Sequence, residues 1–153
     1  MPEKQARVPM LVVDDDAATL EIIQEALMGE DLDIQTALGS EAGLEIFVKQ
    51  RPRIVLVDLM MPTLTGMDLL ERMLEKDPGV EVILMTGHYS TESAVEAIQR
   101  GARDYMAKPL NIEKLRTRIS SLLAEVRQKE TAFHLEGQLI EAFQFEGMIG
   151  RSP

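Results

Sequence analysis

Cysteine is absent from the 153-residue sequence, and the only histidines are His88 and His134. The sequence therefore has no disulfide framework, no thiolate metal site, no cysteine nucleophile and too few histidines for a histidine-rich metal centre. No apolar run approaches the roughly 20 residues that span a bilayer, and the opening residues lack the apolar centre of a signal peptide. These absences favour a soluble, cytoplasmic protein with no membrane partner.

Positive charge is scarce as well. Sixteen lysines and arginines stand against 26 acidic residues, which gives a formal net charge of −10. Such a surface repels nucleic acid, so we expect no direct nucleic-acid binding by this chain. Nothing resembles the G-x-x-x-x-G-K-[ST] phosphate loop, so the chain is not itself an ATPase of that class. The length suits one ordinary domain plus an extension.

Short apolar runs alternate with amphipathic stretches along most of the chain. The apolar runs, which predict strands, are 10–13, 33–37, 54–57, 80–85 and 104–107. The stretches between them, which predict helices, are 17–28, 41–49, 66–76 and 91–100. Five repeats of this alternation predict an α/β fold of the doubly wound kind, with a parallel sheet and helices on both faces.

Apolar spacing and capping residues refine the helix predictions. Three positions read as caps: Asp16 before the first helix, Gly101 after the fourth, and Asn111 before a fifth. Two helices have apolar residues at i, i+3 and i+4 spacing, which predicts one buried stripe on each. These stripes are Leu20, Ile23 and Leu27 on the first helix, and Ala94, Ala97 and Ile98 on the fourth.

Polar side chains stand at the carboxyl ends of four predicted strands, and in open parallel sheets ligands bind outside that edge. Carboxylate oxygens suit Mg²⁺, a lysine suits phosphate, and an aspartate can act as a nucleophile. Together these residue types predict a metal-assisted phosphoryl-transfer site, with Asp58 as the candidate nucleophile. The converging residues are Asp14, Asp15, Asp58, Thr86 and Lys108.

Each of these residues also has a simpler interpretation. Thr86 alone would be an ordinary threonine at a strand end, and Lys108 alone an ordinary solvated lysine. Asp58 ends the apolar run Ile54–Val57, where an unpaired buried carboxylate is penalised, so a functional role explains it better. His88 is more simply a surface histidine than a proton donor. The ten methionines read as core filler, and Gly43 and Gly66 as backbone requirements.

In this arrangement the sequence resembles the receiver domain of bacterial two-component response regulators. The matching stretches are "LVVDDDAAT", "VLVDLMMPTLTGMDLL", "VILMTGH" and "GARDYMAKPLNIEKL", in that order, within about residues 8–124. The resemblance implies a flavodoxin-like (βα)5 fold with strand order 2-1-3-4-5. It also implies a signalling domain rather than an enzyme, with at most self-phosphorylation and self-dephosphorylation.

The resemblance assigns a role to each polar residue at the sheet edge. It implies that Asp58 accepts a phosphoryl group from a sensor histidine kinase. Mg²⁺ would be bound directly by Asp15 and Asp58, through water by Asp14, and by the backbone carbonyl of Met60. Asp16, the third carboxylate of "DDD", falls outside the family's pair and is left as a helix cap.

The resemblance also implies how the signal leaves the site. Thr86 and Lys108 would hold the phosphoryl oxygens, and the Lys108–Pro109 peptide bond would be cis. Thr86 would move toward the phosphoryl group while Tyr105 turns inward behind it. The output surface would comprise 91–100, 104–107 and the fifth helix.

An apolar heptad pattern follows the receiver-like region. It predicts that the fifth helix forms a homodimer together with its extension, although a single long helix covering its own core would give the same spacing. Lys129 occupies one heptad position, and Gly137 weakens the helix further on. The apolar positions are Ile112, Leu115, Ile119, Leu122, Val126 and Phe133.

The closing residues, "FEGMIGRSP", resemble the start of the AAA+ domain of sigma-54-dependent transcriptional activators. We therefore expect a receiver at 1–124, a helical linker at 125–146 and the start of an AAA+ domain at 147–153. The longer protein would bind DNA and sigma-54 RNA polymerase. Phosphorylation would control oligomerisation and activity of its ATPase.

Two other functions remain open at this stage. One is a stand-alone receiver that signals by protein contact. The other is a phosphatase with an aspartate nucleophile, whose family needs a second aspartate two residues later. That position holds Met60 here, which argues against turnover.

Overall fold

The computed structural model describes the backbone of residues 7–150 and the side chains of residues 7–131. Strands and helices alternate from the start of the described chain to its end. The strands are β1 (Val8–Asp14), β2 (Leu32–Leu38), β3 (Ile54–Asp58), β4 (Glu81–Thr86) and β5 (Asp104–Ala107). The helices are α1 (Ala17–Ala26), α2 (Ser40–Gln50), α3 (Gly66–Lys76), α4 (Thr91–Gln99) and α5 (Ile112–Gly150).

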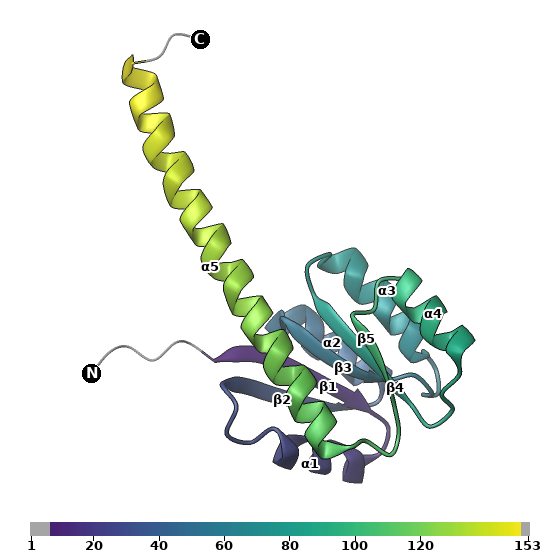
Figure 1. The fold of residues 1–153 in the computed structure, drawn as a ribbon. Helices are drawn as coiled ribbons and strands as arrows, with labels where there is room; N and C mark the ends of the chain where they lie inside the picture. The colour runs from purple at the N-terminus through teal and green to yellow at the C-terminus, as the bar shows by residue number, and fades with distance from the viewer. Residues whose placement is uncertain (1–6, 151–153) are drawn as a thin grey trace. The chain divides into compact units, whose positions relative to one another are not determined.

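The five strands form one parallel sheet in the order β2-β1-β3-β4-β5 (Figure 1). Helices cover both faces of this sheet, so the doubly wound α/β fold and its strand order are confirmed. Central strand β3 is buried along its whole length, as its continuous apolar run predicts. Because β1, β3 and β4 run side by side in one direction, their carboxyl ends meet at the same edge.

One face of the sheet packs against α2, α3 and α4. Alternate residues of the central strands, such as Val55 and Val57 on β3, share a buried cluster with Phe47 of α2 and Leu70 of α3. The stripe predicted on the first helix is confirmed, since its three residues, Leu20 and Ile23 on α1 and the C-cap Leu27, are at most 7% exposed. Arg116, near the start of α5, donates from Nε to the backbone carbonyl of Ala26 at the end of α1, at 2.7 Å.

The predicted helix caps are confirmed. Asp16 is the N-cap of α1 and accepts a hydrogen bond from the backbone N–H of Ala18 at 3.1 Å. Asn111 precedes α5 and accepts from the backbone N–H of Lys114 at 3.0 Å. Gly101 follows α4 with φ of +112°, a left-handed backbone conformation that glycine adopts without steric cost.

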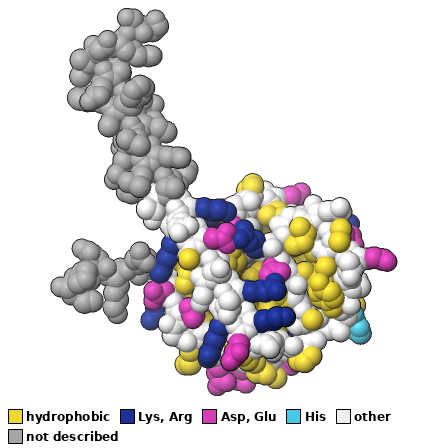
Figure 2. Space-filling model, in the orientation of Figure 1, with side chains coloured by type: hydrophobic (Ala, Val, Ile, Leu, Met, Phe, Trp, Pro, Cys, Tyr) yellow, Lys and Arg dark blue, Asp and Glu magenta, His cyan; other side chains and the backbone are white. Residues whose placement is uncertain are grey.

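One predicted stripe is partly wrong. On α4, Ala97 is fully buried, but the side chain of Ile98 is 50% exposed, and that of Val95 is 49% exposed. Helical spacing places residues on one face but does not say how much of that face the sheet covers. Hydrophobic side chains accordingly gather at the surface in the region of α4 (Figure 2).

Helix α5 is continuous for 39 residues, through Gly137 and past residue 146, where the helical linker was expected to end. Leu122 and Val126 are only 3% and 2% exposed within the single chain. Phe133 and the later heptad positions lie outside the residues whose side chains are described. By its contacts the chain divides into two compact units, Met1–Thr117 and Arg118–Pro153.

The described helices include none that is both long enough and apolar enough to cross a membrane.

The capping role of Asp16 can be tested by stability. Its Oδ1 accepts from the Ala18 N–H and its Oδ2 from the Thr19 hydroxyl. We expect Asp16→Ala to lower the free energy of unfolding by about 1 kcal/mol, measured by urea denaturation. Asp16→Asn, which keeps an acceptor at the cap, should lose less than half of that. Equal losses in the two variants would contradict the capping role.

Candidate functional site

Two buried carboxylates lie next to each other at the carboxyl edge of the sheet. Asp14 is the last residue of β1 and is 0% exposed, and Asp58 is the last residue of β3 and is 5% exposed. Their strands are neighbours, paired from Met10↔Ile54 to Val13↔Val57. The fold therefore brings together two acids that are 44 positions apart in the sequence, and their charges need compensation.

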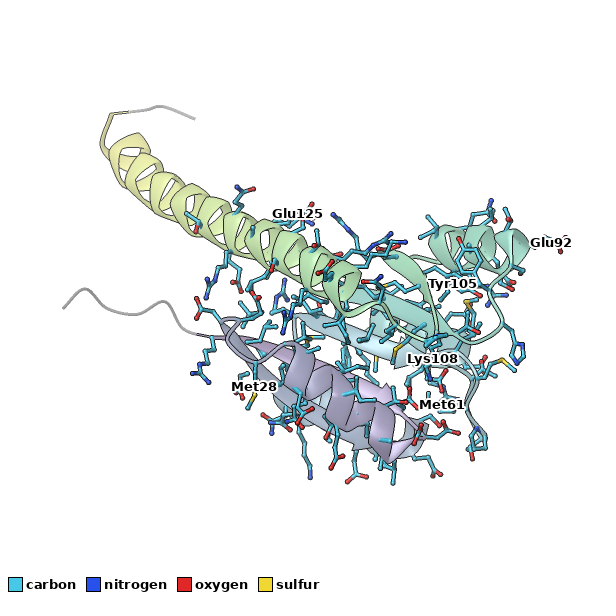
Figure 3. The ribbon with its side chains drawn as sticks, turned by 60° about the horizontal axis from the view of Figure 1, so that its bottom comes forward. Met28, Met61, Glu92, Tyr105, Lys108 and Glu125 are labelled. Carbon is cyan, nitrogen blue, oxygen red and sulfur yellow. The ribbon has the colours of Figure 1, made fainter. Side chains whose placement is uncertain are left out.

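Lys108 supplies the compensating charge. Its Nζ lies 2.8 Å from Asp14 Oδ2 and 3.4 Å from Asp58 Oδ2. Lys108 directly follows β5, and its backbone N–H donates to the carbonyl of Thr86 at 2.7 Å, which fixes where the side chain begins. Figure 3 shows Lys108 at this edge of the sheet, on the side of the loop that contains Met61.

Asp58 is the less well compensated of the two acids. Burial raises the pKa of Asp58 above its ordinary value, and the charge of Asp14 raises it further. The charge of Lys108 and the hydrogen bond from the Met60 N–H act in the opposite direction without cancelling the rise. Burial lowers the pKa of Lys108, but its hydrogen bond to Asp14 and the two carboxylate charges raise this pKa overall. The lysine is therefore held in its charged form.

The acidic cluster fits a hard divalent cation. One oxygen each from Asp14, Asp15 and Asp58 lie within 4.8 Å of one another, and Asp15 is exposed to solvent. Mg²⁺ prefers oxygen ligands and keeps several waters, which suits a site with one open side. A cation also removes the repulsion that raises the pKa of Asp58. The three carboxylates predicted as Mg²⁺ ligands therefore lie close enough together among the described side chains to hold a cation.

Thr86 and the following loop lie beside Asp58. The backbone N–H of Leu59, directly after Asp58, donates to the carbonyl of Met85 at 2.8 Å, so Thr86 is the next residue along the neighbouring strand. Thr86 is fully buried, and its Oγ1 accepts a hydrogen bond from the His88 N–H at 3.0 Å. His88 itself is exposed. All the predicted edge residues thus gather around Asp58.

The loop after Asp58 is held by two close contacts. A side chain at Gly66 would place its Cβ 2.6 Å from the Asp58 carbonyl oxygen, so only glycine fits there. The Ser40 hydroxyl, only 3% exposed as a residue, donates to the carbonyl of Pro62 at 3.4 Å. Gly66 was predicted as a backbone requirement, whereas Ser40 was missed. Its partner lies 22 residues away, and no local pattern indicates such a contact.

Met60, Pro109 and Tyr105 complete the set of predicted residues. The Met60 N–H donates to Asp58 Oδ1 at 3.3 Å, while the Met60 side chain is 57% exposed. The Lys108–Pro109 peptide bond is cis, as the resemblance implied. Tyr105 lies on β5 opposite Leu84 and is only 6% exposed. Its ring already occupies the inward position to which the resemblance assigned it only after a change at the site.

Comparison with known proteins agrees with this geometry. Residues 10–120 match the family model described as the response regulator receiver domain. The chain is 34% identical over 146 residues to the transcriptional regulatory protein ZraR of Escherichia coli K12, covering 95% of this chain and 32% of that protein. It is 30% identical over 141 residues to the regulatory protein LuxO of Vibrio cholerae, covering 92% of this chain and 30% of that protein.

The fold is shared with solved receiver structures. A CheY-like response regulator receiver domain protein from Methanospirillum hungatei superposes with a TM-score of 0.75 at 30% identity, covering 80% of this chain and 98% of that one. The chain thus spans almost the whole of that receiver domain protein, but about a third of the length of ZraR and LuxO.

The raised pKa of Asp58 predicts a pH-dependent stability. The buried carboxylate destabilises the folded state at neutral pH, and this cost disappears once Asp58 is protonated in both the folded and unfolded states. We therefore expect Asp58→Asn to raise the free energy of unfolding at pH 7 in EDTA. The gain should fade as the pH falls through the raised pKa toward the ordinary aspartate value.

Urea denaturation across that pH range measures the effect. Asp33→Asn, which removes one exposed carboxylate from β2, is the control for a change in net charge. A gain from Asp58→Asn that is independent of pH, or no larger than that of the control, would contradict the origin we assign to it.

Proposed function

Because the chain belongs to the response regulator receiver family, we propose that it accepts a phosphoryl group on Asp58 from a sensor histidine kinase. The main support is that Asp14 and Asp58, which end two neighbouring strands, both lie within 3.4 Å of the Nζ of Lys108, which directly follows a third strand. Such a cluster combines a carboxylate nucleophile with a cation for the phosphoryl oxygens.

The transfer has a simple balance of bonds. A carboxylate oxygen of Asp58 attacks the phosphorus of a phosphohistidine, forming a P–O bond as the P–N bond breaks and the imidazole leaves. Since the Met60 N–H already holds Oδ1, Oδ2 on the Lys108 side is the better placed oxygen. Lys108 and the hydroxyl of Thr86 then hold the phosphoryl oxygens.

Asp14, Asp15 and Asp58 would hold Mg²⁺, together with the Met60 carbonyl. When bound, the ion supplies positive charge against the phosphoryl group and the crowded carboxylates. Asp15 is the exposed member of the cluster and Asp14 the one already bonded to Lys108, which supports direct ligation by Asp15 and a water-mediated role for Asp14.

We further propose that the receiver controls a sigma-54-dependent transcription activator. The support is the likeness of "FEGMIGRSP" to the start of an AAA+ domain and the similarity to transcriptional regulatory protein ZraR beyond the receiver. The parts would be a receiver at 1–124, a helical linker at 125–146 and an AAA+ start at 147–153. Phosphorylation would then bias oligomerisation of the ATPase, whose full-length protein would bind DNA and sigma-54 RNA polymerase.

Phosphorylation at Asp58 is testable by intact mass. We expect acetyl phosphate with Mg²⁺ to add one phosphoryl group to the wild-type chain, and EDTA to abolish the addition. Asp58→Asn should gain none, because an amide is a poor nucleophile. Asp16→Ala should be modified like the wild type, since Asp16 only caps α1. Phosphorylation of Asp58→Asn would contradict the assignment.

A second experiment on the wild-type chain distinguishes a receiver from a phosphatase. A receiver treated with beryllofluoride and Mg²⁺ forms a stable adduct, and a phosphatase with an aspartate nucleophile releases phosphate continuously from acetyl phosphate. We expect the adduct and no sustained release, because Met60 replaces the second aspartate of such phosphatases. Continuous turnover would favour the phosphatase.

We also propose that the chain forms a homodimer through α5 and its extension. The expected seam lies near Leu122, Val126 and Phe133, and Phe133 is the heptad position furthest along α5. We expect Phe133→Asp to halve the mass measured by sedimentation at concentrations on the order of tens of micromolar. Thr131→Asp, which adds the same charge at an exposed position, should stay dimeric. Identical masses for all three proteins would contradict the seam.

A further inference from the structure

The side chain of Tyr105 is buried although it carries a polar hydroxyl. Its hydroxyl is buried and has no hydrogen-bond partner among the described residues. Leaving a buried donor unpaired is unfavourable, so the ring needs other contacts to stay inside. It packs in the cluster that contains Ala97 of α4 and Leu84 of β4. Figure 3 shows Tyr105 on the α4 side of the sheet.

A second aromatic ring covers Tyr105. The ring centroids of Tyr89 and Tyr105 are 5.1 Å apart, and the ring planes are tilted by 59°. This lies within the range of about 4.5–7 Å over which aromatic pairs attract beyond the area that they bury. Tyr89 is 54% exposed, so it is the outer ring of the pair and Tyr105 the inner one.

The backbone around Tyr89 is fixed on both sides. Before it, the His88 N–H donates to the hydroxyl of Thr86. After it, Ser90 is the N-cap of α4 and accepts from the Ser93 N–H at 3.1 Å. The backbone that carries the Tyr89 ring is therefore held by the Thr86 hydroxyl on one side and by the first turn of α4 on the other.

We propose that Tyr89 is a positioning residue for Tyr105. Its ring holds Tyr105 in the buried orientation, and it couples that orientation to the β4–α4 loop and hence to the hydroxyl of Thr86. The coupling to phosphorylation rests on the function proposed for Asp58. The positioning of Tyr105 does not, because it is a property of the ring contact itself.

The sequence permits a direct measurement of Tyr105. The chain has two tyrosines and no tryptophan, so replacing Tyr89 leaves Tyr105 as the only fluorescent tyrosine. Tyr89→Phe keeps the covering ring, and Tyr89→Ala removes it. Loss of an aromatic contact changes the ratio of the population with the ring buried to the population with the ring exposed by about 2- to 12-fold. We expect acrylamide to quench Tyr105 substantially more strongly in Tyr89→Ala than in Tyr89→Phe, with no phosphoryl donor present.

A second measurement tests the coupling. Amide hydrogen exchange of residues 104–107 is compared with and without beryllofluoride and Mg²⁺. In the wild type and in Tyr89→Phe we expect beryllofluoride to change exchange in β5. In Tyr89→Ala that change should fall at least about twofold, the lower limit for loss of an aromatic contact. Intact mass after acetyl phosphate should show equal modification of Asp58 in all three proteins.

The outcomes separate the two proposals. Equal quenching in Tyr89→Phe and Tyr89→Ala would overturn the positioning role, whatever happens at Asp58. Unequal quenching with an undiminished exchange response in Tyr89→Ala would overturn the coupling. A wild-type chain that takes no phosphoryl group would instead overturn the proposed function while leaving the quenching result intact. Should Tyr89→Ala fail to fold by circular dichroism, Tyr89→Leu removes the ring but keeps apolar volume, and the same criteria apply.

Discussion

The contact of Lys108 with Asp14 and Asp58 is the interaction on which the site depends. Two carboxylates at the ends of adjacent strands are buried almost completely, and burial together with the charge of Asp14 raises the pKa of Asp58. The lysine lies closer to Asp14, at 2.8 Å, than to Asp58, at 3.4 Å. Asp14 is thereby satisfied, and Asp58 keeps an oxygen whose charge is only partly compensated. That asymmetry suits Asp58 for accepting a group and Asp14 for a supporting role.

This contact also ties the site to the whole sheet. Lys108 follows β5, which pairs only with β4, whereas Asp58 ends β3 on the far side of β4. The lysine therefore reaches the carboxylates only when β3, β4 and β5 are assembled in register. Gly66 adds a second requirement, because α3 can start beside Asp58 only where no Cβ intervenes. A protein that forms the site has consequently formed most of its core.

Much of the fold and of the candidate site could be predicted from the sequence, because the signals that indicate them are local or periodic. The apolar run Ile54–Val57 fixed a buried strand, and its position in a series of alternating elements fixed the sheet edge at which Asp58 lies. Asp16 and Asn111 were identified as caps from residue type and place alone. Site residues at strand ends follow from the same logic, since parallel strands bring their carboxyl ends together.

The features that the sequence analysis missed or predicted wrongly depend on contacts between residues that are far apart in the sequence. The spacing of Ile98 is that of a buried residue, but the extent of its cover is set by neighbouring elements. Ser40 and Tyr89 have no sequence signature, because the groups that they contact are a carbonyl 22 residues away and a ring on β5.

A continuous series of contacts runs from the site through β4 and the loop after it to β5. The Leu59 N–H donates to the Met85 carbonyl, and the Lys108 N–H donates to the Thr86 carbonyl. The His88 N–H donates to the Thr86 hydroxyl, and the ring of the next residue, Tyr89, contacts that of Tyr105, three residues before Lys108. Because β5 is a four-residue edge strand with one neighbour, it is the part of the sheet held by the fewest ladder bonds. Lys108, which contacts Asp58, and Thr86, whose carbonyl accepts from the Lys108 N–H, are the residues that connect the site with this strand. Elements that move in allostery are drawn from the least stable parts of a fold, so under the function proposed for Asp58 we expect β5 and the rings beside it to be the part that responds.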